Sequence, residues 1–513
     1  MNQTADDFVG RLGRLTHLGH AARNACFMRQ VEFGIASGGT FLAKAAGPSP
    51  SAWANLMSLY RFLQNDEVPL SSLRQIRGRL ALDSVPDGAD VLVVHDLTLL
   101  DYTGHHAKKD RRPIGNHGGS GYEYAVYALI APGTGHFLGV LHDTVISAQG
   151  PDDQDAMDYD HDPLFADVSP EQKARLRLNH RHQMATHLRG LSPRWAGRHP
   201  IHVADCEFDD IFVFAGCVQK GQDFVIRSAG DRNVQIQRQP WIPDQALTRP
   251  QAGHPLPPGW VTARLRRLAE AVPRQPYKSL PLDKDNRVVE ASAAVRTAHL
   301  SIGSFRVRLY RHAQRNKRYV RPPHPVEVNV VVIRETAPPP GVEPLLWVLF
   351  TSLPTQTFEQ RAYVGGLYER RWTIEEFFKL LKSGYRIEAA RMDNATQTGK
   401  LLVILSLAAM VLLSLKAQLR LPATGPLNDP DYRRVQQAAQ RPDDPALPLN
   451  LRVFALLLRY GGWLGRKNDP IGPTVLMRGM LQLLATLHAL THDAALLHEA
   501  QENLLLLKTL FPI

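Results

Sequence analysis

The sequence predicts a mixed α/β core flanked by helical regions at both ends. Two apolar runs, VLVVHD ending at Asp96 and IHVAD ending at Asp205, have the pattern of buried strands that each stop at an acid. Strand-like and helical segments alternate around them, as expected of a mixed sheet. Ligand chemistry in such sheets gathers at the carboxyl ends of strands, so both aspartates are candidate site residues.

Length, charge and cysteine content limit the classes of protein to which the sequence can belong. The chain has 513 residues, which is too long for one ordinary core, so two to four domains are expected. Lys and Arg number 60 against 49 Asp and Glu, giving a net charge of +11, which favours a polyanionic partner such as nucleic acid. Its three cysteines form no CxxC pair, which argues against a disulfide scaffold or a cysteine zinc site and fits a reducing cytoplasm.

Nothing in the sequence predicts a membrane segment. The N-terminus, MNQTADDFVGRLGRL, lacks the apolar core of a signal peptide. The apolar run at 401–415 is shorter than the roughly 20 residues that span a bilayer, so we expect a buried helix.

Residues 1–85 form the first region, which we predict to be helical. Apolar residues recur at heptad-like spacing through 9–33 and again through 53–63, with arginines between them. A serine after Pro48 and Pro50 is a plausible cap for the second stretch. Whether these arginines contact DNA or are only solvated is left open by the pattern.

The next region is predicted to form the sheet. A polar loop follows Asp96, and the runs YEYAVYALI and HFLGVLHDTVI flank a five-residue Pro/Gly turn, which predicts a β-hairpin. A helix is expected over 170–190, then the strand ending at Asp205, a short helix over 209–218 and the strand DFVIR.

The amino-acid composition changes twice further along the chain. Residues 235–355 are rich in proline and contain the strand-like runs FRVRLY, VEVNVVVI and LLWVLF, which predict a β-rich insertion. A polar, Pro-rich connection follows the apolar run, and 450–513 is Leu-rich and predicted to be helical.

The stretch 367–385, LYERRWTIEEFFKLLKSGY, connects these regions and is predicted to form one helix. At about 100° per residue, one narrow face would carry a phenol, a guanidinium, a carboxylate and two ammonium groups. These belong to Tyr368, Arg371, Glu375, Lys379 and Lys382. A second, apolar face would carry Leu367, Ile374, Phe378, Leu381 and Tyr385.

This pattern has an ordinary structural explanation as well as a functional one. An amphipathic surface helix with solvated ion pairs would show the same spacing, and an acid at a strand end often only accepts hydrogen bonds from turn amides. However, three carboxylates from distant parts of the chain, two at strand ends and one on a helix, suit hard divalent cations.

The motifs resemble a known family. The residues Tyr368, Arg371, Glu375 and Lys382 match the Y-(2)-R-(3)-E-(6)-K signature of bacterial cut-and-paste insertion-sequence DDE transposases, of the kanamycin-resistance composite transposon type. LYRFLQND, VVHDLTLLDY, VADCEFDDI with FVIRSAGDRN, and RYGGWLGRKNDPIGPTVLMRGM resemble the family too, in its order along the chain. The family's arginine-rich motif in the N-terminal domain is thinner here, in LGHAARNACFMR.

The resemblance implies a domain organisation. It comprises a helical DNA-recognition domain over 1–85, a ribonuclease-H-like catalytic domain over 86–395 with the β-strand insertion at about 235–355, and a helical dimerisation domain over 396–513. It further implies a cytoplasmic, nucleoid-associated bacterial protein that binds double-stranded DNA as a homodimer in a synaptic complex.

The resemblance also implies roles for residues. Asp96, Asp205 and Glu375 would be the catalytic metal ligands for two Mg²⁺ ions, with Mn²⁺ able to substitute. Glu376 competes with Glu375, but only Glu375 satisfies the spacing. The DNA-binding residues would be Tyr368, Arg371, Lys379, Lys382 and Arg227.

The implied reaction is excision of a DNA element from its terminal inverted repeats. Water frees a 3′-hydroxyl, which attacks the opposite strand to form a hairpin; water reopens the hairpin, and the same hydroxyl attacks target DNA. Paired Mg²⁺ ions roughly 3.5–4 Å apart serve such in-line displacements with carboxylate ligands.

Other interpretations were weighed. His95, His105, His106 and His117 match no standard zinc spacing. His142 and Asp143 lack a nucleophile motif beside them, which argues against a catalytic dyad. A small-molecule hydrolase is disfavoured because the cations beside Glu375 would depress the pKa that a general acid needs raised. A catalytically silent, transposase-derived DNA-binding protein or inhibitor stays open as the alternative function.

Overall fold

The computed structural model describes most of the chain between residues 5 and 479. The described residues are 5–37, 50–115, 118–152, 169–171, 195, 197–250, 256–282, 296–309, 325–418, 429–441, 444, 446–447, 449–463, 471–472 and 475–479. The chain divides into two compact units, one built from 1–86, 97–152 and 372–513 and the other from 87–96 and 153–371. Each unit is therefore assembled from segments that are distant in sequence.

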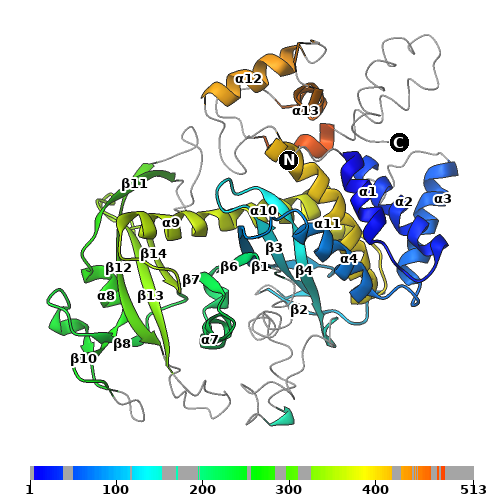
Figure 1. The fold of residues 1–513 in the computed structure, drawn as a ribbon. Helices are drawn as coiled ribbons and strands as arrows, with labels where there is room; N and C mark the ends of the chain where they lie inside the picture. The colour runs from blue at the N-terminus through cyan, green and yellow to red at the C-terminus, as the bar shows by residue number, and fades with distance from the viewer. Residues whose placement is uncertain are drawn as a thin grey trace. The chain divides into compact units, whose positions relative to one another are not determined.

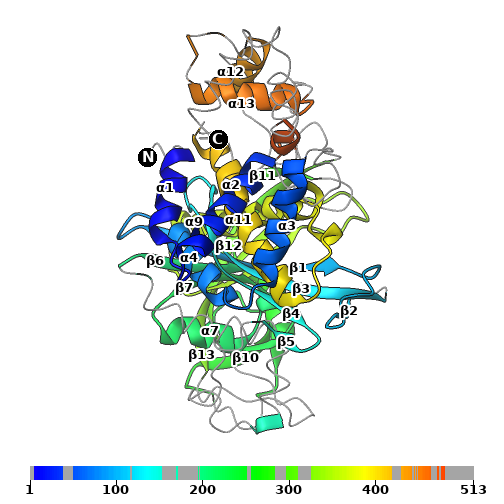
Figure 2. The ribbon, with the colours of Figure 1, turned by 90° about the vertical axis from the view of Figure 1, so that its right-hand side faces the viewer.

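The first unit combines helices with an antiparallel part of the sheet (Figures 1 and 2). Its helices are α1 (Ala5–Leu15), α2 (Ala21–Ser37), α3 (Pro50–Gln64), α4 (Leu70–Leu82), α10 (Thr373–Lys379), α11 (Ala395–Gln418), α12 (Asp429–Gln440) and α13 (Leu449–Tyr460). Its strands are β2 (Arg112–Ile114), β3 (Gly119–Ile130), β4 (Phe137–Ser147), β5 (Gly150–Pro151) and the second half of β1 (Asp90–Asp101). The predicted hairpin is confirmed, because β3 and β4 pair antiparallel from Glu123 opposite Ile146 to Ile130 opposite Phe137.

Helix α11 lies in the core of the first unit, packed on β4 and α2 (Figure 1). Leu401–Leu413 are buried throughout, as the apolar run predicts. The helix is long and apolar enough to cross a membrane, yet 89% of that apolar stretch is buried inside the protein. The prediction of a buried helix is therefore confirmed.

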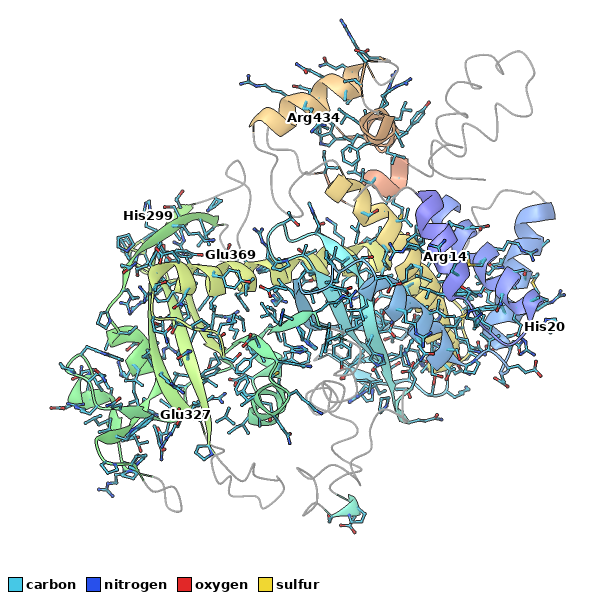
Figure 3. The ribbon with its side chains drawn as sticks, in the orientation of Figure 1. Arg14, His20, His299, Glu327, Glu369 and Arg434 are labelled. Atoms are coloured by element: carbon cyan, nitrogen blue, oxygen red, sulfur yellow. The ribbon has the colours of Figure 1, made fainter. Side chains whose placement is uncertain are left out.

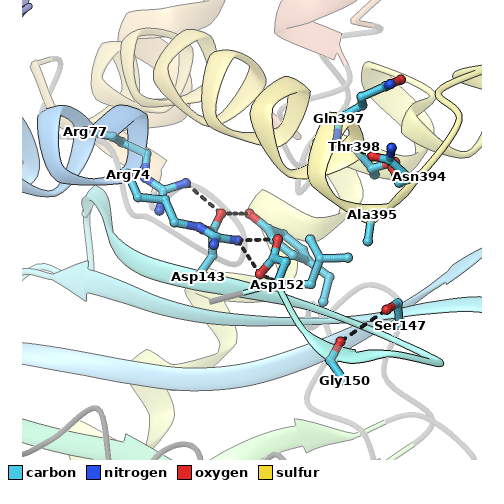
Figure 4. Close-up of polar contacts among 12 residues, drawn as sticks. Arg74, Arg77, Asp143, Ser147, Gly150, Asp152, Asn394, Ala395, Gln397 and Thr398 are labelled. Carbon is cyan, nitrogen blue, oxygen red and sulfur yellow. Dashed lines mark hydrogen bonds and ion pairs between the residues drawn. The ribbon is translucent and has the colours of Figure 1, made fainter. Parts of the chain in front are cut away.

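A buried ion-pair network joins α4 to β4 (Figure 4). The Arg74 guanidinium donates to Asp143 at 2.5 Å and to both carboxylate oxygens of Asp152 at 2.9 and 2.8 Å. Arg77 donates to the other oxygen of Asp143 at 2.7 Å, and the Tyr124 hydroxyl donates to that oxygen at 2.7 Å. Burial alone would raise the pKa of Asp143, but the two guanidinium groups hold it well below its usual range. Asp143 is thus a structural anchor of the N-terminal helices.

The described part of the second unit is a long mixed sheet with helices packed on it (Figure 1). Its strands are the first half of β1, then β6 (His199–Ala204), β7 (Asp223–Arg227), β8 (Asn233–Gln237), β9 (Leu247–Thr248), β10 (Trp260–Arg264), β11 (Gln275–Leu282), β12 (Arg296–Leu309), β13 (Val326–Glu335) and β14 (Leu346–Thr351). Its helices are α7 (Ile211–Gln219), α8 (Leu265–Ala271) and α9 (Phe358–Glu369). In space the strands follow the order β1, β6, β7, β14, β13, β12, β8, β10, β9, with β11 paired to β12.

Two kinds of pairing meet in this sheet. β1, β6 and β7 are parallel neighbours, whereas β7 with β14 and every following pair are antiparallel. The strands predicted between 235 and 355 form much of this antiparallel part, where Glu327 of β13 pairs across to Arg306 of β12 at 2.7 Å (Figure 3). The mixed α/β fold is therefore confirmed. One strand boundary differs, because β1 runs through Asp96 to Asp101.

Helix α9 begins at a capping box and leads into the motif segment. The Thr357 hydroxyl accepts from the Gln360 amide at 3.3 Å, while the Gln360 side chain accepts from the Thr357 amide at 3.1 Å. The helix packs on β12, β13, β6 and β7, with Lys278 of β11 paired to Glu369 at its end (Figure 3). The last turn of α9 is thereby held against the sheet.

The helix predicted over 170–190 falls almost wholly outside the described residues, as do His117 and most of the region beyond 460.

Candidate active site

Three predicted site residues lie at one level of the three parallel strands in the second unit. The paired register brings His95 of β1 opposite Ala204 of β6, and Ala204 opposite Ile226 of β7. Each site residue comes one position later: Asp96 lies inside β1, Asp205 directly after β6 and Arg227 at the end of β7. Parallel strands that end in functional residues therefore describe β6 and β7, whereas β1 continues past its acid.

Asp96 is nearly buried and is bound by a cation. Only 7% of its surface is exposed, and its Oδ2 accepts a hydrogen bond from Arg371 Nη1 at 2.6 Å. Arg371 is itself only 7% exposed and lies in the 3₁₀ turn Arg370–Trp372 that continues α9. A charge-assisted hydrogen bond of this length restrains the carboxylate strongly.

Tyr368 adds a phenol to the same cluster from the last turn of α9. The guanidinium of Arg227 is hydrogen-bonded to its oxygen, and the ring lies edge-on to Trp347, with centroids 5.5 Å apart. Burial raises the pKa of the Tyr368 hydroxyl, although Arg371 and Arg227 oppose that shift. The phenol is therefore protonated at neutral pH.

Asp205 begins a tight turn after β6. Its side chain accepts from the Glu207 amide at 2.9 Å and caps the 3₁₀ turn Cys206–Phe208. Asp209, four residues later, accepts from the Ala229 amide at 2.7 Å and pairs with Arg232. The loop after β7 is thus tied to the turn after β6, which stabilises the backbone that follows Arg227.

A chain of buried polar side chains also crosses β1, β6 and β7. His95 Nε2 lies 2.8 Å from His202 Nδ1, and His202 Nε2 lies 2.8 Å from Gln222 Oε1. Burial lowers the pKa of His202 to about 4, so its ring is neutral at neutral pH. His95 is thus buried within β1 and paired with a second histidine.

Glu375, Lys379 and Lys382 belong to the first unit and are described there by themselves. Glu375 and Lys379 are exposed on α10, while the competing Glu376 is half-buried. Lys382 pairs with Glu388 at 3.5 Å. The structure thus brings together Asp96, Asp205, Arg227, Tyr368 and Arg371 in one unit and places the remaining three predicted site residues in the other.

The prediction of one continuous α-helix over 367–385 is wrong, because the segment is interrupted. α9 ends at Glu369, the 3₁₀ turn follows, α10 ends at Lys379, and 380–384 is a π-helical turn closed by the Tyr385 amide on the Leu380 carbonyl at 2.7 Å. Arg386, in the left-handed region at φ 51°, ends the segment. The predicted apolar face holds, since Leu367, Ile374, Phe378, Leu381 and Tyr385 are all at most 4% exposed.

The donor set suits a hard divalent cation. Asp96 and Asp205, on β1 and directly after β6, are carboxylates, the oxygen ligands that Mg²⁺ prefers. Within the described part of the chain, no three His, Cys, Asp or Glu side chains are grouped closely enough to hold an ion. The residues that sequence reasoning missed are Asp209, Arg232, His202 and Gln222. Asp209 and Arg232 stand inside motifs already singled out, which was the available signal.

Comparison with models of protein families matches residues 88–411 to the transposase DDE domain. The match covers well over half of the chain and includes all three candidate acids, Asp96, Asp205 and Glu375.

Proposed function

The chain belongs to the family of transposases with a DDE domain, and from this premise we propose that it excises a DNA element and joins it to a new site. The substrates are double-stranded DNA at the element's terminal inverted repeats and at the target. The observation that carries the proposal is the cluster at the strand ends, where Asp96 and Asp205 lie on adjacent parallel strands and Arg371 binds Asp96 at 2.6 Å.

Asp96, Asp205 and Glu375 would hold Mg²⁺, or Mn²⁺ in its place. When bound, a metal pair activates the attacking oxygen and stabilises the leaving oxygen of a phosphodiester. The protein contributes position, because Asp96 is held by Arg371 and Asp205 by the turn that it caps. Carboxylates restrained in this way lose little freedom when they take up a ligand.

The basic side chains and the Tyr368 hydroxyl would bind the DNA. Arg227, Arg371, Lys379 and Lys382 carry the charge and the donors that phosphate oxygens accept. Tyr368, held in the protonated form, can donate to a phosphate from the same cluster. Gripping phosphates on both sides of a cleavage point would let the freed 3′-hydroxyl reach the opposite strand and form a hairpin.

The finer organisation follows from the same proposal. The core over 86–395 is ribonuclease-H-like, with the β-rich insertion at about 235–355. The helices over 1–85 recognise the terminal repeats, and 396–513 dimerises in a synaptic complex of the insertion-sequence type. The working compartment is the bacterial cytoplasm, where the protein meets chromosomal DNA.

The test uses DNA carrying the element's own inverted repeats in Mg²⁺. Wild type and Glu376→Gln should release excised ends or hairpins, whereas Glu375→Gln should lower the cleavage rate by at least about 10³-fold, because a catalytic ligand is lost. Gel analysis of end-labelled DNA measures the products. Glu376→Gln is the matched control, since it removes one carboxylate from the neighbouring position of the same helix.

Two results would contradict the proposal. Equal cleavage by Glu375→Gln and wild type would show that Glu375 is not a metal ligand. Salt-sensitive binding of the repeats by wild type without any cleavage in Mg²⁺ or Mn²⁺ would instead support a catalytically silent DNA-binding protein.

A further inference from the structure

The buried chain of His95, His202 and Gln222 lies directly beside the two strand-end acids. His95 and His202 are 1% and 0% exposed, and Gln222 is 6% exposed. His95 immediately precedes Asp96, and His202 comes three residues before Asp205. Buried polar groups that form an unbroken chain are costly to interrupt, because each lost partner leaves a desolvated group behind.

The hydrogen bonds that link His95, His202 and Gln222 all run in one direction, from donor to acceptor. Gln222 Oε1 can only accept, so His202 Nε2 carries a proton. Because the His202 ring is neutral, its Nδ1 is bare and accepts from His95 Nε2. The chain thus runs from β1 through β6 to the residue before β7 and joins three strands through side chains alone.

Side-chain support matters here because the pairing of β6 stops short of Asp205. The register of β1 with β6 runs from Asp90 to His95, and that of β6 with β7 ends at Ala204 opposite Ile226. Asp96 lies inside β1, which continues to Asp101, whereas Asp205 follows the last residue of β6. The alignment of Asp205 with Asp96 therefore depends on what braces the end of β6.

Aromatic rings enclose the chain. The Phe208 ring packs against His95 with centroids 6.1 Å apart, and the Trp195 ring meets His202 edge-on at 6.4 Å. Phe208 belongs to the turn that Asp205 caps, so that turn rests on the first imidazole of the chain. A substitution that breaks the hydrogen bonds of His95, His202 and Gln222 would therefore affect the positions of both acids.

We propose that His95, His202 and Gln222 are positioning residues that align Asp96 with Asp205 so that the two carboxylates bind a divalent cation together. This rests on the proposed function, because it assumes that the two acids are metal ligands. The three residues touch neither metal nor DNA. They act by holding the end of β6 level with Asp96 of β1, as supporting shells do in metal sites.

The experiment measures Mn²⁺ binding to the full chain by the loss of the free-ion electron paramagnetic resonance signal, without DNA. Gln222→Met removes the acceptor at similar volume and should weaken Mn²⁺ binding about tenfold or more, as loss of outer-shell partners does. Gln222→Glu keeps an acceptor oxygen at the same position and should restore binding to within about threefold of wild type. Thermal unfolding is followed in parallel.

His142→Leu is the matched control for loss of a buried polar side chain. His142 is 7% exposed and stacks on Tyr127 in the other unit. It should lower the melting temperature about as much as Gln222→Met does but leave the Mn²⁺ affinity unchanged. Wild-type affinity in Gln222→Met, or an equal loss of affinity in His142→Leu, would overturn the positioning role.

Asp205→Asn separates this inference from the proposed function. It should weaken Mn²⁺ binding at least as much as Gln222→Met, because it removes a ligand. If Asp205→Asn binds Mn²⁺ like wild type, the metal site itself is wrong and both proposals fall. If only Asp205→Asn weakens binding, the metal site stands and the positioning role is wrong.

Discussion

At the scale of single residues, the clearest contrast is between Asp143 and the acids of the candidate site. Asp143 is fully buried and paired with Arg74 and Arg77 (Figure 4). Asp205 is partly exposed directly after β6, where it accepts from the Glu207 amide. A carboxylate whose oxygens are both engaged by buried arginines has no geometry left for a ligand. Asp143 therefore stabilises the fold, whereas Asp205 is the acid that we propose as a metal ligand.

Asp143→Ala should lower the free energy of unfolding by about 3–5 kcal/mol, because it leaves two buried guanidinium groups without this partner. Chemical denaturation followed by circular dichroism measures the change. Glu270→Ala, which removes an exposed ion pair to Arg267, is the control and should cost at most about 1 kcal/mol. Comparable losses in the two variants would contradict the structural role of Asp143.

At the scale of elements, the N-terminal helices depend on close backbone packing. A Cβ added at Gly78 of α4 would lie 2.5 Å from the Leu141 carbonyl oxygen of β4, so only glycine lets this helix approach the strand. The same helix carries Arg74 and Arg77 to Asp143. Close packing and the ion pairs therefore act on the same interface.

Gly78→Ala should destabilise the protein by about 1–3 kcal/mol through overpacking, even though alanine is the better helix former. Gly10→Ala in α1 is the control, since its added Cβ would meet only Arg14 Nη1 at an ordinary 3.7 Å. That variant should raise stability by up to about 1 kcal/mol. A melting temperature that moves in the same direction in both variants would count against the close approach of α4 to β4.

At the scale of the whole molecule, the net charge of +11 predicts DNA binding that is strongly salt-dependent. For about 6–10 phosphate contacts, raising salt from about 50 to 200 mM should weaken the affinity about 10³–10⁵-fold through counterion release. Fluorescence anisotropy of a labelled duplex measures the affinity at each salt concentration.

Lys379→Gln should reduce the slope of log affinity against log salt by about one. Arg306→Gln, which loses a cation already paired with Glu327, should leave that slope unchanged. An affinity that does not respond to salt would contradict a phosphate-binding surface.

Much of the fold could be predicted because its signals are local. The apolar runs before Asp96 and Asp205, the β3–β4 hairpin and the buried α11 each follow from patterns within about 25 residues, and the structure confirms them. The irregular segment after Glu369 could not be predicted in the same way. A Cβ at Gly384 would lie 2.9 Å from both Leu380 and Met477, so this segment packs closely against a residue that is distant in the sequence.

The family, the identities of the candidate acids and the apolar face of the motif segment follow from the amino-acid sequence, because motif spacing and apolar periodicity are properties of the chain alone. The partners of the site residues become visible only in the folded protein: Arg371 on Asp96, Arg227 on Tyr368, and the hydrogen-bonded series from His95 through His202 to Gln222. These contacts depend on which strands become neighbours and in what register, and hydrogen bonds between residues 20 to 275 positions apart leave no periodic trace in the sequence.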